Sequence, residues 1–158
     1  MILRSDAIER TIGYGRALAK LLENDDVVVL CGDLGAGKTH LTKGIAEGLG
    51  VSSDITSPTF NIMRQYECDG DKVLCHWDLY RLDEIEQLDD VDFYGMLESG
   101  CITVIEWGDR FPEALPDDYL KISISLDSAT ERTLELEGIG PRGIALAQGL
   151  ASMFAGVE

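Results

Sequence analysis

Residues 27–46 read VVVLCGDLGAGKTHLTKGIA, which places an apolar run, a glycine-rich loop and a helical pattern in unbroken succession. The run from Val27 to Cys31 is typical of a parallel strand that is buried on both faces. After the loop, Leu41, Ile45 and Leu49 recur at the spacing of one helix face. The segment therefore predicts a buried strand, a loop and a helix, which is the local organisation of an α/β domain.

The loop fits the phosphate-binding pattern G-x-x-x-x-G-K-[ST] without a gap. Glycines at 32, 35 and 37 let the backbone curl, so that successive N–H groups can point at phosphate oxygens. Lys38 can reach the β and γ phosphates, and the Thr39 hydroxyl can ligate Mg²⁺. The helix that follows directs its positive end toward the same anion. We therefore predict that the chain binds a nucleoside triphosphate with Mg²⁺. The loop residues predicted to contact the nucleotide are Gly32, Asp33, Leu34, Gly35, Ala36, Gly37, Lys38, Thr39 and His40.

The composition predicts one domain that spans residues 1–158. At 45% hydrophobic residues, the chain has enough apolar surface to form its own core. No apolar stretch approaches the roughly 20 residues of a membrane span, and Met1 to Asp6 lack the apolar segment of a signal peptide. The four cysteines form no C-x-x-C pair, and with two histidines they offer no zinc template. We expect a cytoplasmic protein with reduced cysteines and no membrane contact.

The charge is strongly negative, with 29 acidic against 13 basic residues and a formal net charge of −16. Direct, tight binding to a nucleic-acid backbone requires a basic surface, because neutralisation of the phosphates supplies much of the affinity. If the protein serves nucleic-acid chemistry, we expect it to act through basic protein partners. The alternative is that the acidity only keeps the protein soluble.

The remaining pattern predicts a three-layer α/β fold whose mixed sheet has a parallel core and antiparallel additions. A polar segment around one proline, residues 55–60, separates the phosphate-loop helix from the next strand. The expected helices are an opening helix from Ser5 to Leu22 capped by Ser5 or Asp6, an acidic helical region from Asp83 to Glu98, and a last helix from Pro141 to Phe154. The expected strands are a hairpin over 62–66 and 72–77, a strand over 101–105, and an antiparallel pair at 120–126 and 133–137.

Two acidic residues stand at the ends of predicted strands. A phosphate loop needs a carboxylate on a neighbouring buried strand to hold Mg²⁺ and its waters, and Glu106 follows the apolar run 101–105. Asp78 closes the second strand of the hairpin, where it can order a metal-bound or attacking water. The alternatives are structural, since Glu106 can cap a strand end and Asp78 can cap a turn or helix. We predict Asp78, Lys38 and Glu106 as catalytic residues, with Thr39 and Glu106 at the metal.

Four further residues are candidates with two open interpretations each. Thr59 can offer its hydroxyl to the γ-phosphate and Mg²⁺, which would make the segment 56–60 a nucleotide-sensing loop, or it can belong to a simple turn. Arg81 and Arg110 can neutralise charge on a transferring phosphoryl group or pair with the abundant acids. Trp107 can pack near the nucleotide or belong to the core.

Taken together, the motifs resemble the TsaE (YjeE) family. The residues that carry the resemblance are Gly-Asp-Leu-Gly-Ala-Gly-Lys-Thr at 32–39, Ser-Pro-Thr-Phe at 57–60, His-Trp-Asp-Leu-Tyr-Arg-Leu at 76–82 and Ile-Glu-Trp at 105–107. The resemblance implies a small ATPase that supports formation of N6-threonylcarbamoyladenosine in bacterial tRNA. It implies ATP and Mg²⁺ as cofactors and the TsaD and TsaB proteins as partners, with the adenylate substrate made by TsaC. Contact with tRNA is then expected only through the partner complex.

The resemblance also assigns roles to individual residues. It makes Lys38 the phosphate lysine, Thr39 and Glu106 the Mg²⁺-associated pair and Asp78 a residue needed for hydrolysis. It further implies switch-like loops at 57–60 and 76–81, and it places Glu9 and Thr11 near the nucleotide base. One departure is that His40 stands where the family more often has a second threonine, which can alter contacts with the α-phosphate.

Two other classes of P-loop protein fit less well. A small P-loop kinase, our alternative function, would call for an acceptor site and a lid with several arginines, and the sequence has no arginine cluster. A GTPase generally reads guanine through Asn-Lys-x-Asp, which is absent, and the D-x-x-G match at 92–95 follows an acidic helical region rather than a strand. We therefore expect an ATPase that hydrolyses slowly alone, because no arginine finger or attacking-water glutamine is evident.

Overall fold

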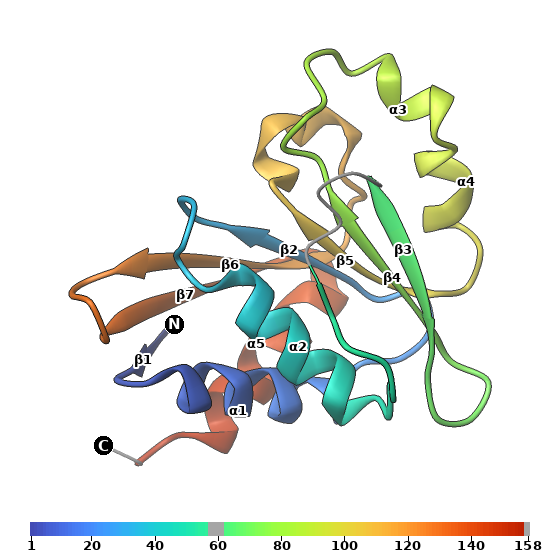
Figure 1. Ribbon diagram of the computed structural model, residues 1–158. Coiled ribbons are helices and arrows are strands. Elements are labelled where there is room, and N and C mark those ends of the chain that lie inside the picture. Colours follow the sequence, from blue (N-terminus) through green and yellow to red (C-terminus); the bar gives the residue numbers. More distant parts are fainter. Residues whose placement is uncertain (57–61, 157–158) are drawn as a thin grey trace.

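The computed structural model describes residues 1–56 and 62–156, and a single mixed sheet runs through them (Figure 1). The strands are β1 (Ile2–Ser5), β2 (Val27–Cys31), β3 (Met63–Glu67), β4 (Val73–Asp78), β5 (Ile102–Glu106), β6 (Tyr119–Leu126) and β7 (Arg132–Ile139). Their order across the sheet is β1-β7-β6-β2-β5-β4-β3. The pairs β6–β2, β2–β5 and β5–β4 are parallel, and the outer pairs are antiparallel. The mixed sheet with a parallel core and antiparallel additions is thus confirmed.

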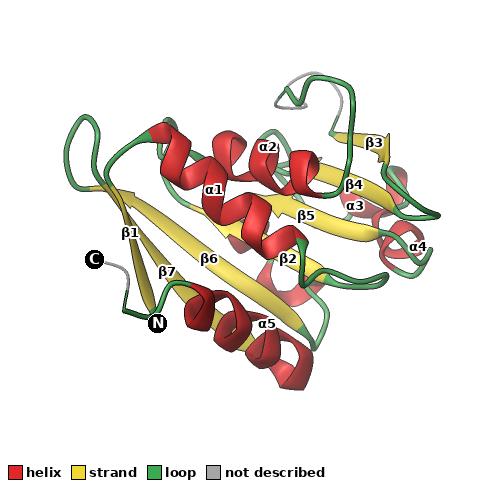
Figure 2. Cartoon of the chain, turned by 90° about the horizontal axis from the view of Figure 1, so that it is seen from below, coloured by secondary structure: helices red, strands yellow, loops and turns green. Residues whose placement is uncertain are grey.

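Helices cover both faces of this sheet. The helices are α1 (Ile8–Ala19), α2 (Lys38–Gly48), α3 (Gln87–Asp90), α4 (Phe93–Leu97) and α5 (Gly140–Met153), with 3₁₀ turns η1 (Gly108–Arg110) and η2 (Pro112–Ala114). Helices α1, α2 and α5 share one apolar core with one face of the sheet, and Figure 2 shows all three in front of it. The short helices and 3₁₀ turns after β4 and β5 cover a second core on the other face.

Strand β2 lies at the centre, as its continuous apolar run predicts. Val28 and Leu30 belong to the core under α1, α2 and α5, whereas Val27, Val29 and Cys31 belong to the core on the other face. All five side chains are buried. Because the strand has parallel neighbours on both sides, its carboxyl end lies beside those of β5 and β6.

Helix α2 is held against α1 by a close backbone approach. A Cβ atom on Gly44 would lie 2.0 Å from the carbonyl oxygen of Ile12, and one on Gly15 would lie 2.4 Å from that of Leu41. No side chain fits between the helices at these points. The contact fixes the direction of α2, and therefore the place of Lys38 at its first residue.

The prediction of an opening helix from Ser5 to Leu22 is wrong at its start. Residues Ile2–Ser5 form the edge strand β1, which pairs with β7 and buries Leu3 and Ser5 on one face. The helix begins only at Ile8, its N-cap is Ala7, and no side chain caps it. The Ser5 hydroxyl donates to the carbonyl oxygen of Ala7 at 2.8 Å instead. Pairing with a strand distant in sequence outweighs the local helix signal here.

The acidic region predicted as one helix from Asp83 to Glu98 is two short helices, α3 and α4. The chain turns between them at Asp92, whose φ is +55°. Leu88 and Phe93 are the anchors that are fully buried, and their separation of five residues does not place them on one helix face. The β3–β4 hairpin, β5, the β6–β7 pair and the last helix lie where they were predicted within one or two residues.

All four cysteines are free thiols. Among the residues that the structure describes, no helix has the length and apolar content needed to cross a membrane. The segment 57–60, including Thr59, lies outside the described residues.

Candidate functional site

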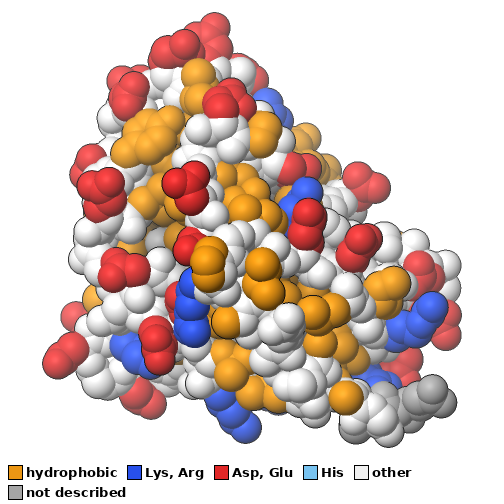
Figure 3. Space-filling view, turned by 180° about the vertical axis from the view of Figure 1, so that it is seen from behind, with side chains coloured by type: hydrophobic (Ala, Val, Ile, Leu, Met, Phe, Trp, Pro, Cys, Tyr) orange, Lys and Arg blue, Asp and Glu red, His pale blue; other side chains and the backbone are white. Residues whose placement is uncertain are grey.

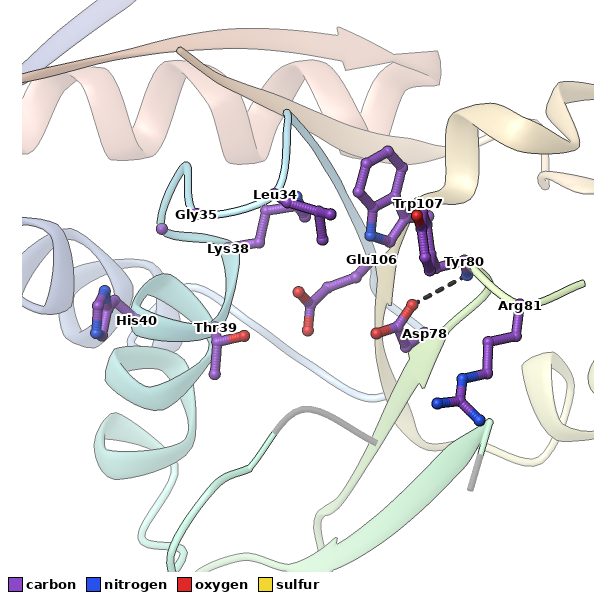
Figure 4. A pocket seen from close by; sticks show the side chains of 11 residues that line it. Leu34, Gly35, Lys38, Thr39, His40, Asp78, Tyr80, Arg81, Glu106 and Trp107 are labelled. Carbon is purple, nitrogen blue, oxygen red and sulfur yellow. Dashed lines mark hydrogen bonds between the residues drawn. The ribbon is translucent and has the colours of Figure 1, made fainter. Parts of the chain in front are cut away.

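A cavity of about 390 Å³ opens where β2, β4 and β5 end (Figure 4). The strands bring their last residues together because they are parallel neighbours, with Asp78 of β4 opposite Glu106 of β5. The loop between β2 and α2 forms the facing wall. The lining residues are Leu34, Gly35, Gly37, Lys38, Thr39, His40, Asp78, Tyr80, Arg81, Glu106 and Trp107.

The loop has the curled backbone that its glycines predict. Gly32 has a φ of +148°, and a Cβ atom there would lie 2.5 Å from the carbonyl oxygen of Ile124. Gly37, the N-cap of α2, has a φ of +113° in the left-handed region. Side chains other than glycine rarely adopt such values. Helix α2 consequently begins at the cavity, where its first N–H groups can meet an anion.

Lys38 is 5% exposed, and its ammonium group lies inside the loop. The Nζ atom donates to the carbonyl oxygens of Gly32 at 2.5 Å and Asp33 at 2.9 Å. It also lies 4.3 Å from the centroid of the Trp107 ring, a cation–π contact. Burial lowers the pKa of Lys38 below 10.5, and the nearby carboxylates of Glu106 and Asp78 oppose that effect in part. A buried cation so placed is suited to an anionic ligand.

The two carboxylates project from neighbouring strands toward the same space. Figure 4 shows Glu106 between Thr39 and Asp78, with its oxygens facing the gap. Glu106 is 2% exposed, and its Oε2 hydrogen bonds with Nε2 of His76. Asp78 accepts a hydrogen bond from the backbone N–H of Tyr80 at 3.0 Å. The Asp78 side chain therefore orders the turn after β4 and also lines the cavity.

Aromatic side chains form the remaining wall. Trp107 follows β5 with a φ of +63°, and its ring centroid lies 5.0 Å from that of Tyr80. Arg110 lies 5.9 Å from the Tyr80 ring centroid and 3.9 Å from an oxygen of Asp83. Trp107 packs against the core and also lines the cavity, and its packing near a nucleotide stays a prediction. Of the two candidate arginines, Arg81 lines the cavity and Arg110 pairs with an acid.

Some predicted residues lie apart from the cavity wall. Gly32, Asp33 and Ala36 belong to the loop without lining the cavity. Thr11 is 1% exposed on α1, and its hydroxyl hydrogen bonds with that of Ser5 at 2.8 Å. The structure does not bring Thr11 to the cavity, so its contact with a nucleotide base stays a prediction.

Sequence reasoning assigned no separate role to Tyr80, His76 or Arg132. The buried Arg132 donates from Nε to the carbonyl oxygen of Ala36 at 2.8 Å, although the two lie 96 positions apart. It thereby supports the phosphate loop from β7. No local pattern points to Arg132, whereas Tyr80 and His76 stand in the 76–82 motif and were identifiable as a group.

The sequence model of the family described as "Threonylcarbamoyl adenosine biosynthesis protein TsaE" matches residues 5–134. This chain belongs to the TsaE family. The family inferred from the four motifs is thereby confirmed, and the match runs from the end of β1 into β7.

Named relatives support the assignment to the TsaE family. The tRNA threonylcarbamoyladenosine biosynthesis protein TsaE of Streptomyces coelicolor is 45% identical over 134 residues, covering 81% of this chain and 90% of the relative. The Bacillus subtilis protein of the same name is 39% identical over 144 residues, covering 90% and 89%. The crystal structure of Bacillus subtilis YdiB superposes with a TM-score of 0.80 at 31% identity, covering 97% of this chain and 95% of that one.

Proposed function

We propose that residues 1–158 act as one P-loop ATPase domain in the biosynthesis of threonylcarbamoyladenosine in tRNA. The observation that carries the proposal is the meeting of Lys38 with two carboxylates, Asp78 and Glu106, at the mouth of a glycine-rich loop. Membership of the TsaE family supplies the pathway, because its relatives are named for that biosynthesis. The site supports ATP as the substrate, because a buried ammonium group and the amino end of a helix favour binding of a polyphosphate.

Binding of ATP is assigned to the loop and the aromatic wall. The loop's backbone N–H groups and the ammonium group of Lys38 contact the phosphates, and the first turn of α2, with Thr39 and His40, lies beside them. Trp107 packs at the side of the nucleotide. The cation–π contact between Lys38 and Trp107 keeps the ammonium group beside the loop, so less ordering is needed when the ligand enters.

The residues present also fit Mg²⁺. Thr39 offers a hydroxyl and Glu106 a carboxylate, which are the hard oxygen donors that this ion takes. Among the described residues, no group of three histidine, cysteine or acidic side chains forms a metal site of its own. That is the expected arrangement for an ion held by one or two protein oxygens together with substrate phosphates. When bound, the ion neutralises charge on the phosphates.

Hydrolysis is assigned to Asp78. Its carboxylate stands at the end of β4, and the N–H of Tyr80 holds one of its oxygens, so the group can orient a water molecule or accept its proton. The cavity-lining residues include one arginine, Arg81, and no glutamine. Beyond Lys38 and the metal, one arginine is therefore at hand to stabilise the transferring group, and the ATPase is slow until a partner completes the site.

The partners proposed from the family are TsaD and TsaB, which carry out the transfer. The net charge of −16 favours basic protein surfaces and disfavours direct contact with tRNA. Contact with tRNA is therefore indirect, through the partner complex. The proposed location is the cytoplasm.

The proposal is tested in a reconstituted tRNA threonylcarbamoylation assay at catalytic concentrations of the partners, with and without this protein. Omission should stop multiple turnover, wild-type protein should restore it, and Lys38→Ala should not. Binding of ATP is followed in parallel by calorimetry, where Lys38→Ala should greatly weaken affinity. Full activity without the protein would remove the assignment to this pathway, and phosphorylation of a small-molecule acceptor would favour a kinase instead.

A further inference from the structure

Beneath the cavity, His76 and Glu106 form a buried pair. They lie on adjacent parallel strands, β4 and β5, on the face that α2 covers. The side chain of His76 is 0% exposed and that of Glu106 is 3% exposed. Nε2 of the imidazole hydrogen bonds with Oε2 of the carboxylate. His76 does not line the cavity, whereas Glu106 does.

The donor and acceptor of this bond follow from the chemistry of the two groups. An ionised carboxylate can only accept hydrogen bonds, so Nε2 carries the hydrogen. Nδ1 of His76 is buried without a partner among the described residues. A buried N–H without an acceptor costs about 1–3 kcal/mol, which favours the tautomer with a bare Nδ1 and the hydrogen on Nε2. His76 is therefore a donor to Glu106.

The bond leaves one carboxylate oxygen for a ligand. Oε2 is occupied by the imidazole, and the carboxylate as a whole faces Thr39 and Asp78 (Figure 4). A buried carboxylate without a partner is costly, and rotation of the side chain toward another partner lowers that cost. The imidazole opposes rotation, because its N–H holds Oε2 and so fixes the rotamer of the carboxylate. Because β4 and β5 are interior strands, paired on both sides, the donor is held by the sheet itself rather than by a loop.

We propose that His76 is a positioning residue, which holds the Glu106 carboxylate in the orientation that receives the metal-associated nucleotide. The inference rests on the proposed ATPase function and adds a residue to its machinery. Because His76 does not line the cavity, it acts through Glu106. Partners that orient a liganding group in this way typically contribute about 10- to 100-fold to metal affinity or activity.

The test compares ATP affinity with Mg²⁺ and with a chelator, measured by calorimetry on the full chain. His76→Phe keeps a ring of similar size and removes the donor, whereas His76→Gln retains an N–H near the place of Nε2. We expect His76→Phe to leave the ATP affinity measured in chelator within about twofold of wild type. The same change should lower the ATP affinity measured with Mg²⁺ by about tenfold or more. His76→Gln should recover most of the lost Mg²⁺-assisted affinity. Thr103→Val, a buried polar deletion on the opposite face of β5, is the matched control and should change neither value.

A double-mutant cycle separates positioning from general stability. Once Glu106→Gln has removed the carboxylate, adding His76→Phe should lower Mg²⁺-assisted affinity by no more than about twofold. Full additivity, or equal losses with and without Mg²⁺, would overturn the proposal. Thermal melts accompany every variant, and if His76→Phe fails to fold, His76→Asn replaces it, because its shorter amide does not reach Glu106.

The outcomes distinguish this inference from the function on which it rests. If wild-type protein fails to bind ATP, the proposed function itself fails. If wild-type binds ATP and Lys38→Ala does not, while His76→Phe keeps the wild-type Mg²⁺ dependence, only the positioning role is overturned.

Discussion

Lys38 carries a positive charge at a place where burial disfavours charge. Its ammonium group is satisfied by two loop carbonyls and by the face of Trp107, and burial still lowers its pKa. The fraction of neutral Lys38 therefore begins to rise at a lower pH than it does for an exposed lysine. Because a polyphosphate requires the charged form, the proposed binding of ATP should depend on pH through this single side chain.

We predict that ATP affinity falls as pH rises through the pKa of Lys38, and that the fall begins below pH 10.5. The sign follows from the lowered pKa, since protonated Lys38 is lost earlier than in an unfolded chain. The affinity is measured by titrating a fluorescent ATP analogue at a series of pH values from neutral to alkaline. Lys38→Arg keeps its charge throughout, so its affinity should stay level, and a parallel fall in this variant would assign the effect to another group.

For the proposed ATPase, a change at Asp78 tests whether binding and hydrolysis can be separated. Asp78→Asn preserves an oxygen that can accept from the N–H of Tyr80, but it removes the charge and the basic site. We expect ATP affinity within about threefold of wild type and a hydrolysis rate lower by about 10²- to 10⁴-fold. Phosphate release under saturating ATP is the measurement. An unaltered rate would reduce Asp78 to a turn residue, and Asp89→Asn, at an exposed position of α3, serves as the control.

The pair α1 and α2 determines where the phosphate loop ends. Gly44 lets the two helices meet backbone to backbone, and the first turn of α2 carries Lys38 and Thr39. A side chain at Gly44 would displace α2 along its whole length, because helices move as rigid units. Packing far from the cavity thus controls the geometry of the cavity.

Gly44→Ala should lower the free energy of unfolding by about 1–3 kcal/mol, because its Cβ atom would overlap the Ile12 carbonyl. Gly13→Ala is the matched control, since Gly13 lies within α1 with nothing within 4 Å of the added atom. That change should stabilise by about 0.5–1 kcal/mol, because alanine loses less backbone entropy in a helix. Urea denaturation of both variants measures the difference. Equal effects of the two would show that the helices can separate at little cost.

The charge of the whole molecule limits its partners. Figure 3 shows acidic side chains spread over one face among apolar ones, with basic side chains interspersed. The excess of 29 acidic over 13 basic residues gives a net charge of −16, which disfavours the approach of a nucleic-acid backbone. Two explanations of this acidic surface remain equally open. It can favour association with basic proteins, or it can keep the protein soluble.

The isolated protein should bind tRNA more weakly than the roughly 10⁻⁴ M that is typical of non-specific binding at physiological salt. The reason is that 13 basic residues against 29 acidic ones leave few cations to displace the counterions condensed on the phosphates. Filter binding over a range of salt concentrations measures it. Micromolar, salt-dependent binding by the chain alone would contradict the proposed indirect contact with tRNA.

The phosphate loop and the central strand were predictable from local sequence. The glycines between 32 and 37 permit backbone angles that other residues rarely adopt, and the run 27–31 is apolar without interruption, so both signals lie within one short segment. The hairpin, the β6–β7 pair and the last helix follow from local periodicity in the same way. The family, too, was evident in four short motifs, and its model matches the chain.

The contacts between distant residues became visible only in the folded chain. The edge position of β1, the support of Ala36 by Arg132 and the bond of His76 to Glu106 each join segments at least 30 positions apart. Such contacts depend on strand order, register and the direction of α2. The conformation of the phosphate loop is thus encoded locally, because backbone angles and apolar runs depend on residues that are adjacent in the sequence. The orientation of each side chain in the site is a property of the whole sheet, because parallel strands bring remote residues to one edge.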